Sequence, residues 1–344
     1  MEMDLVVSKL IFNVAIMFIM MVPGVILRKC KMIPDGFSKG VSNLVLYIAQ
    51  PALILNAYVS CTDRDILVDG LVVLLISVLA HIIFAVVAFL TFAKNPDGKK
   101  RLLRLATIFA NAAFMGVPLI SAIYAGTPLA GRATIFASIY NFTFNIFLWS
   151  LGVFICTNKR DDNNDGILDP HIMERKKSAP FIKAIVHPVT MAALLGVLVI
   201  ILDLRVKAPQ IFGAESLLCS SLTTLAGLVA PLSMVVIGLR LADVNFKSFF
   251  NDVYMYICFA LRHFVLPLAV MGTMLLLRLI GVPVTREVFL VCLILAATPS
   301  ASSSTMFAEK FDCDAPYVNR IVVVSTLLSI GTMPLILLLA SSVA

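Results

Sequence analysis

The chain has 344 residues, of which 60% are hydrophobic and only 14% are charged, and its mean hydropathy is +1.00. A soluble globular domain carries roughly 25% charged residues, so this composition excludes a water-soluble fold of this length. The net charge of +7 does not indicate a nucleic-acid partner, because the basic residues lie mostly in short segments between apolar runs, where they orient a membrane protein.

Long apolar runs recur along the chain and predict ten membrane-spanning helices. A hydrocarbon core of roughly 30 Å needs about 20 apolar residues per helix, and without water to satisfy backbone groups such runs must be helical. The first span follows an acidic N-terminus, which is unlike the basic start of a signal peptide. The predicted spans cover residues 6–27, 41–59, 66–92, 104–126, 132–156, 184–203, 216–241, 249–277, 287–309 and 317–340.

Lysine and arginine are distributed unevenly among the predicted loops. With the N-terminus outside, the inner segments hold 19 of the 27 basic residues and the outer segments hold seven. Because basic residues mark the cytoplasmic side, both termini are predicted outside and the long loop of residues 157–183 in the cytoplasm. The expected location is the plasma or inner membrane.

Five spans precede the long loop and five follow it, so the two halves have opposite predicted orientations. Three residue pairs also share nearly one offset: Pro51 with Pro231 at 180 residues, Pro118 with Pro299 at 181, and His81 with Arg262 at 181. The sequence therefore predicts an all-α polytopic membrane protein of two inverted five-helix repeats, residues 1–156 and 184–344.

The fourth and ninth spans are predicted to be interrupted, because each carries a proline among small and polar residues. A proline inside a helix removes one backbone hydrogen bond, which is tolerated in a membrane where protein or a water-filled cavity satisfies the freed groups. Paired interrupted helices at equivalent positions are typical of a transporter's midplane binding site. The candidate binding residues are Asn111, Gly116 and Pro118 in the fourth span and Thr298, Pro299, Ser300, Ser302 and Ser303 in the ninth.

The chemistry of these breaks predicts an anionic ligand such as a small carboxylate. A half-helix that begins at a break presents free N–H groups and the positive end of its dipole. The serine hydroxyls and the Asn111 amide add donors, and no acidic residue sits beside either break. The alternative is that serine and glycine permit tight helix packing, with the hydroxyls bonded to their own backbone.

The fifth span carries a polar face. Asn141 and Asn145 are one turn apart beside Tyr140, and amides facing lipid would be costly, so this face is predicted to point inward. These side chains either bind substrate or form interhelical hydrogen bonds.

Ionisable groups inside the spans are few, and each is a candidate for ion coupling. His81 lies within span three, and Arg262 and His263 lie within span eight, where they either couple transport to an ion or belong to a structural network. Asp69, near the outer end of span three, is either a vestibule group or an interfacial charge.

No metal site, cofactor or enzymatic activity is predicted. The seven cysteines form no CxxC pair and have no metal-ligand spacing with the four histidines. The segment 161–169 begins like a calcium loop, but Ile172 occupies the closing position, and ordinary turn residues explain the pattern equally well. No Walker loop, nucleophile elbow or HExxH motif supports a pump or a hydrolase.

At these residues the chain resembles the auxin efflux carrier family, which includes plant auxin exporters and bacterial malate- or malonate-type permeases. NAAFMGVPL in the fourth span is similar to the family's Asn-x-x-x-Met-Gly-Ile-Pro-Leu crossover. FAEKF in the ninth span, Ala226–Ala242 and Arg262–Pro267 resemble further family segments, and the resemblance covers nearly the whole chain in order.

This resemblance implies that spans four and nine cross at Pro118 and Pro299 and that Asn111 contacts the substrate carboxylate. It also implies a scaffold of spans one, two, six and seven and an elevator-like transport domain from the remaining spans. Plant carriers have an Asp and a Lys one turn apart in span three, whereas Val73 follows Asp69 at that spacing here. A small metabolic anion is therefore favoured over auxin.

The sequence thus predicts a secondary transporter, acting as an exporter of a small organic anion by elevator-like alternating access within a lipid-embedded homodimer. One rival is a sodium-coupled symporter of the bile-acid type, which would place acidic groups or a Gln/Glu cluster near the crossover. Gln50, also a candidate binding residue, is the one nearby candidate for such a cluster. A second rival is a membrane sensor that binds its ligand without transporting it.

Overall fold

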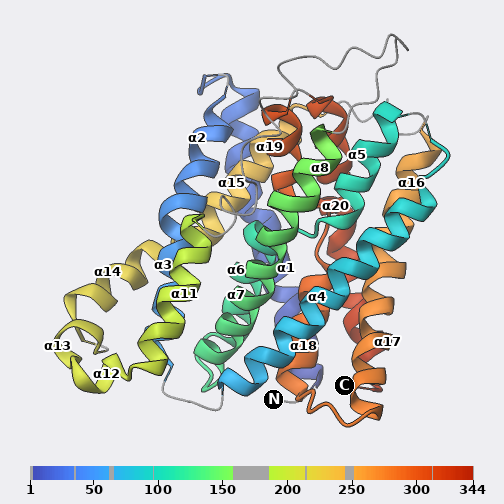
Figure 1. Cartoon of the computed structure of the whole chain (residues 1–344). Helices are drawn as coiled ribbons and strands as arrows, with labels where there is room; N and C mark the ends of the chain where they lie inside the picture. Colours follow the sequence, from blue (N-terminus) through green and yellow to red (C-terminus); the bar gives the residue numbers. More distant parts are fainter. Residues whose placement is uncertain are drawn as a thin grey trace.

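The computed structural model describes most of the chain, namely residues 3–34, 36–61, 66–95, 97–157, 186–213, 215–244, 252–311 and 313–343. All regular secondary structure in these ranges is helical, apart from one isolated β-bridge (Figure 1). Apart from Thr157, the predicted cytoplasmic loop, with its segment 161–169, lies outside the described residues.

Seven described helical stretches are long and apolar enough to cross a membrane. They correspond to predicted spans one, two, three, five, seven, eight and ten, and several contain a π-helical turn, labelled η. The stretches are α1 (Met3–Lys29); α2 (Phe37–Leu44), η1 (Val45–Ala49) and α3 (Gln50–Ser60); α4 (Ile66–Thr91); α7 (Ala130–Phe147), η3 (Leu148–Gly152) and α8 (Val153–Thr157); α13 (Pro209–Phe212), α14 (Leu217–Ala226) and α15 (Val229–Ala242); α16 (Val253–Ala260), η5 (Leu261–Val265) and α17 (Leu266–Leu279); and α20 (Ala315–Ala340).

The other three predicted spans consist of shorter helices. Span six is α11 (Pro188–Ile201), which is followed by the single turn α12 (Leu204–Lys207). Span four is divided into α5 (Asp97–Ile108) and the joined η2 (Ala112–Gly116) and α6 (Val117–Tyr124), and span nine into α18 (Arg286–Ala297) and α19 (Ser302–Lys310). In Figure 1, α5 and α19 lie toward the end of the molecule away from both termini, whereas α18 lies toward the termini.

Three prolines within spans follow π-helical turns. Pro51, Pro118 and Pro267 each stand two residues after the end of η1, η2 and η5, respectively. A proline has no N–H for the carbonyl four residues earlier and crowds that carbonyl, so the preceding turn widens to i→i+5 hydrogen bonds. Pro118 therefore lies in the first turn of α6, after a widened turn, whereas Pro299 lies within the break between α18 and α19.

The two divided helices cross and are joined by backbone hydrogen bonds. Asn111 N donates to Pro299 O at 2.7 Å, and Ala301 N donates to Phe109 O at 2.8 Å, on either side of the β-bridge. These bonds satisfy backbone groups that the interruption of the helices would otherwise leave unpaired inside the protein. We call this junction of residues 109–111 and 298–301 the crossover.

A different contact joins α1 to α15. Gly24 and Gly238 face each other, and a Cβ atom on Gly238 would overlap the Met21 carbonyl group, while one on Gly24 would overlap the Val235 carbonyl group. Small residues permit this close backbone approach, which provides much of the packing energy between helices in a membrane.

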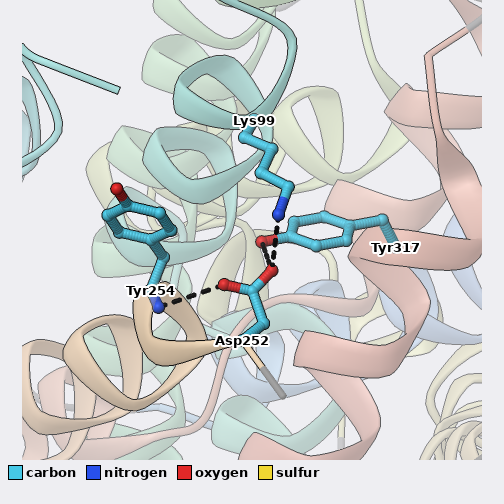
Figure 2. A network of polar contacts seen from close by, with 4 residues as sticks. All are labelled: Lys99, Asp252, Tyr254 and Tyr317. Carbon is cyan, nitrogen blue, oxygen red and sulfur yellow. Dashed lines mark hydrogen bonds and ion pairs between the residues drawn. The ribbon is translucent and has the colours of Figure 1, made fainter. Parts of the chain in front are cut away.

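The start of α16 is fixed by a polar network at the end of the molecule away from the termini (Figure 2). The Asp252 carboxylate accepts hydrogen bonds from Tyr254 N at 3.1 Å, Tyr317 Oη at 3.1 Å and Lys99 Nζ at 3.0 Å. Burial acts to raise the pKa of Asp252, but these three donors outweigh it and lower the pKa. The network caps α16 and ties it to α5 and α20.

Candidate functional site

A cavity of about 530 Å³ lies beside η2 and α19, the two helices that begin just after the crossover. It extends from Ala113 and Ser303, near the starts of η2 and α19, to Lys39 in the first turn of α2 and Lys310 at the end of α19. Both helices, α2 and α19, lie toward the end of the molecule opposite the termini (Figure 1). The remaining lining residues are Asn43, Leu46, Tyr47, Gln50, Phe144, Asn145, Leu148, Trp149, His187, Met306, Phe307 and Glu309.

The inner end of the cavity is rich in hydrogen-bond donors. The first turn of a helix has backbone N–H groups without intrahelical acceptors and carries the positive end of the dipole, and two such starts meet here. Gln50 Nε2 donates to Ala113 O at 2.7 Å, which fixes the side chain against η2. Gln50 Oε1 has no protein partner. The predicted binding residues Gln50 and Ser303 both line this cavity.

Asn111 lies in the crossover itself and is fully buried. Its Nδ2 atom is 3.5 Å from Ser302 Oγ, at the outer limit of a hydrogen bond, and its Oδ1 atom has no protein partner. Gly116, by contrast, packs against α18, and a Cβ there would lie 2.5 Å from Leu295 Cδ2, so the Leu295 side chain would have to shift. The crossover therefore holds one loosely constrained side-chain amide, which does not itself line the cavity but lies two residues before the lining residue Ala113.

The polar face of α7 is only partly turned to the cavity. Asn145 lines it and donates from Nδ2 to Asn141 O at 3.0 Å. Tyr140 and Asn141 are fully buried behind the wall, and neither the Tyr140 hydroxyl nor the Asn141 amide has a protein partner. Such unpaired buried polar groups are costly in a purely structural role.

The polar groups of the ninth span are only partly engaged inside the protein, because Ser300 Oγ and Thr305 Oγ1 are buried without a hydrogen-bond partner. Thr298 Oγ1 donates to Leu295 O at 2.7 Å, and the backbone N–H of Ser300 donates to Ser325 Oγ at 2.9 Å. Ser302 O accepts a hydrogen bond from Arg240 Nη1 at 2.7 Å. Of the predicted residues in this span, Ser303 is the one that lines the cavity.

The candidate coupling residues occupy separate places. His81 is fully buried among aromatic rings, with Nδ1 2.7 Å from Ser77 O and Nε2 unpartnered. His263 Nε2 is 2.9 Å from Ser325 Oγ, close to the crossover. Asp69 forms an ion pair with Arg132 between α4 and α7, and neither lines the cavity.

Arg262 is also fully buried and contacts the crossover helices directly. Its Nη1 atom donates to Thr107 O at 3.1 Å, and its Nη2 atom donates to Ala296 O. His81, which lies 181 residues earlier in the chain, instead contacts Ser77 O within its own helix.

Several residues of the cavity mouth were missed by the sequence analysis. Lys310 Nζ lies 4.5 Å from the centroid of the Trp149 ring, and Trp149 packs edge-on against Phe307 at 5.0 Å. Lys39 and Lys310 are among the basic residues counted for the inner segments, and Lys310 also lies in the FAEKF segment, but no sequence pattern brings them together with Trp149.

His187, at the N-terminus of α11, also lines the mouth. Burial, and then the positive charge of Lys310, lower the pKa of His187 to about 4, so its ring is neutral near pH 7.

The arrangement can hold an anion with an apolar body. Two helix starts, the Gln50 and Asn145 amides and two lysines supply donors or positive charge, while aromatic and aliphatic side chains form the walls. Glu309, beside Lys310 at the mouth, is the single acidic side chain among the described lining residues. In the described part of the chain, no group of three or more His, Cys, Asp or Glu side chains is arranged to bind a metal ion.

Comparison with known proteins gives two findings. A family described as "Membrane transport protein" matches residues 9–337 of the chain. A protein described as an uncharacterized transporter from Methanothermobacter thermautotrophicus is 23% identical over 316 residues, which cover 91% of this chain and 92% of that protein. Both matches extend over nearly the whole chain and are not confined to one segment.

Proposed function

The chain belongs to the membrane transport protein family, the auxin efflux carrier family, and on that premise we propose that it exports a small organic anion such as a carboxylate. The resemblance drawn from the crossover motif is thus confirmed at the level of the family. With seven described helices long enough to span a bilayer, the protein is a multi-pass membrane transporter.

The observation that carries the proposal is the cavity at the crossover. One end of the cavity lies at the Gln50 amide and near the starts of η2 and α19, and the other end is lined by Lys39 and Lys310. A carboxylate placed at the inner end would accept hydrogen bonds from first-turn N–H groups and from the Ser303 hydroxyl. Rearrangement of the loosely held Asn111 amide would add a further donor.

The proposed mechanism is elevator-like alternating access by ten helices in two inverted repeats, residues 1–156 and 184–344. In support, the two divided helices lie in equivalent places of the two halves and cross at the binding cavity. With both termini outside, the cavity mouth at Lys39 and Lys310 faces the cytoplasm, which is the loading side for an exporter. The scaffold would be spans one, two, six and seven, within a homodimer.

The test is uptake into proteoliposomes of labelled malonate, malate and indole acetate, with proton and sodium gradients imposed in turn. Wild-type protein should show saturable transport, and Asn111→Ala should reduce it about tenfold or more, because a site built to hydrogen-bond its ligand is left one donor short. Asn13→Ala is the matched control, since Asn13 bonds only to Lys9 O within α1, and it should transport like the wild type.

Each outcome is decisive. Transport driven by sodium alone would favour the bile-acid-type symporter. Binding of an anion, detected by thermal stabilisation, without transport of any anion would favour the sensor. Equal transport by wild type and Asn111→Ala would remove Asn111 from the site.

A further inference from the structure

Two helices end at the crossover with their carboxyl termini inside the protein. α5 ends at Ile108 and α18 at Ala297, and both residues are buried. The last turn of a helix leaves carbonyl oxygens without intrahelical donors and carries the negative end of the helix dipole. Two such ends that meet away from water therefore need both hydrogen-bond donors and positive charge.

The Arg262 side chain provides both hydrogen-bond donors and positive charge at these helix ends. One guanidinium nitrogen donates to Thr107 O in the last turn of α5, and another donates to Ala296 O in the last turn of α18. The guanidinium carbon lies 4.8 Å from the centroid of the Phe84 ring of α4, which holds the group from a third helix. A planar fork of donors suits this bridging position better than an ammonium group does.

The π-helical turn η5 presents two neighbouring residues to the crossover. Arg262 reaches the helix ends, and His263 reaches Ser325, whose hydroxyl oxygen accepts the Ser300 N–H at 2.9 Å. π-Helical turns of this kind often lie at functional positions. Span eight thus supports the crossover with two consecutive side chains.

The dipoles of the two helix ends balance the charge of Arg262. Within the described residues no Asp or Glu forms an ion pair with Arg262. A fully buried charge without compensation is strongly unfavourable. The guanidinium and the two helix ends therefore depend on one another.

We propose that Arg262 is a built-in counter-charge that joins the two carboxyl-terminal helix ends of the crossover, in place of a bound inorganic cation. Resting on the proposed function, this assigns Arg262 as a positioning residue, because it holds the crossover in the shape that directs the two helix starts at the anion. Stability and anion transport should then be independent of sodium.

The test compares wild type, Arg262→Lys, Arg262→Gln and Arg262→Ala of the full chain. Thermal unfolding in detergent and malonate uptake in proteoliposomes are measured in sodium, potassium and N-methyl-D-glucamine chloride. The wild type should behave alike in all three salts. Arg262→Gln should lose about tenfold or more of the uptake rate, because the helix ends lose their charge, and Arg262→Lys should lose less.

Chemical rescue separates charge from simple packing. Guanidinium chloride at non-denaturing concentration should partly restore the melting temperature and uptake of Arg262→Ala. Arg278→Ala is the matched control: Arg278 also donates to two carbonyl groups, Val284 O and Val343 O, and lies 4.7 Å from the Phe289 ring centroid, but it is remote from the crossover. The melting temperature and uptake of Arg278→Ala should not depend on sodium, and guanidinium should not rescue its uptake.

Three results would overturn the proposal: a wild type that needs sodium for stability or uptake, an Arg262→Gln protein equal to wild type, or Lys and Gln variants that are equally impaired. If Arg262→Ala does not fold, the comparison of Lys with Gln decides. If the wild type moves no anion, the proposed function fails, while the melting temperatures in the three salts still test the counter-charge.

Discussion

Two crossings of helices in this protein are built in opposite ways. Where α1 meets α15, two uninterrupted helical segments approach through Gly24 and Gly238 until backbone touches backbone. At the crossover, the helices stop, and the strands of chain between them pair through two backbone hydrogen bonds. At the first contact the glycines leave no room for a Cβ atom, whereas the helices that begin at the second contact line a cavity of about 530 Å³.

The two crossings differ in how their backbone N–H and C=O groups obtain hydrogen-bond partners. Continuous helices satisfy their own N–H and C=O groups, so their contact can be apolar, close and fixed. Two interrupted helices leave four helix ends inside the protein, and the backbone groups at these ends require hydrogen-bond partners from elsewhere. The carboxyl ends obtain them from Arg262, and the amino ends are left beside the cavity. An interrupted helix thus gains free N–H groups that can bind a ligand, but it no longer satisfies all of its own backbone groups.

Substitution at the fixed contact should have the largest effect. Gly238→Ala places a methyl group into the Met21 carbonyl, so α1 and α15 must separate, and we expect a loss of about 3 kcal/mol in stability, the upper range for overpacking. The measurement is thermal unfolding in detergent. Gly272→Ala is the control, because a Cβ at Gly272 meets nothing within 4 Å. Equal melting temperatures for the two variants would contradict the close contact.

The cavity mouth should respond to acid. Because the folded-state pKa of His187, about 4, lies below the unfolded value of roughly 6.5, folding favours the neutral ring. The contribution of the neutral ring to the free energy of unfolding is complete above pH 6.5 and is lost as the pH falls toward 4. At pH 5 the loss amounts to about 2 kcal/mol. His187→Gln should remove that part of the pH dependence of the melting temperature. An unchanged pH profile in this variant would show that another group titrates.

A smaller effect is expected at the edge of the crossover. Gln50→Leu keeps the side-chain size but leaves Ala113 O without its donor, so anion affinity should fall about tenfold, equivalent to about 1.4 kcal/mol. The KM for malonate uptake measures this. Asn43→Leu is the control, since Asn43 is an exposed amide on the wall of the same cavity. A larger rise in KM for Asn43→Leu than for Gln50→Leu would indicate that the anion binds nearer the cavity mouth.

The sequence analysis located the interruptions and most of the helices, whereas the surroundings of individual side chains follow from the tertiary structure. Hydrophobicity and prolines are local signals, and they placed the ninth-span break at Pro299. The same signal at Pro118 pointed to the break itself, but the helix there only widens, and the interruption lies earlier, at residues 109–111. Which hydroxyl groups reach the cavity depends on the rotation of α19, and no single-sequence pattern reports that.

By itself, the sequence determined that this chain is helical, that it belongs in a membrane and that two of its spans are broken, because burial in lipid permits few solutions for an apolar backbone. Only the tertiary structure decided what each broken end meets. Lys39, Trp149, His187 and Lys310 gather at one mouth, and Arg262 reaches two helices that are far apart in sequence. Such partnerships arise from packing between distant segments, where the geometry of the whole fold selects the neighbours.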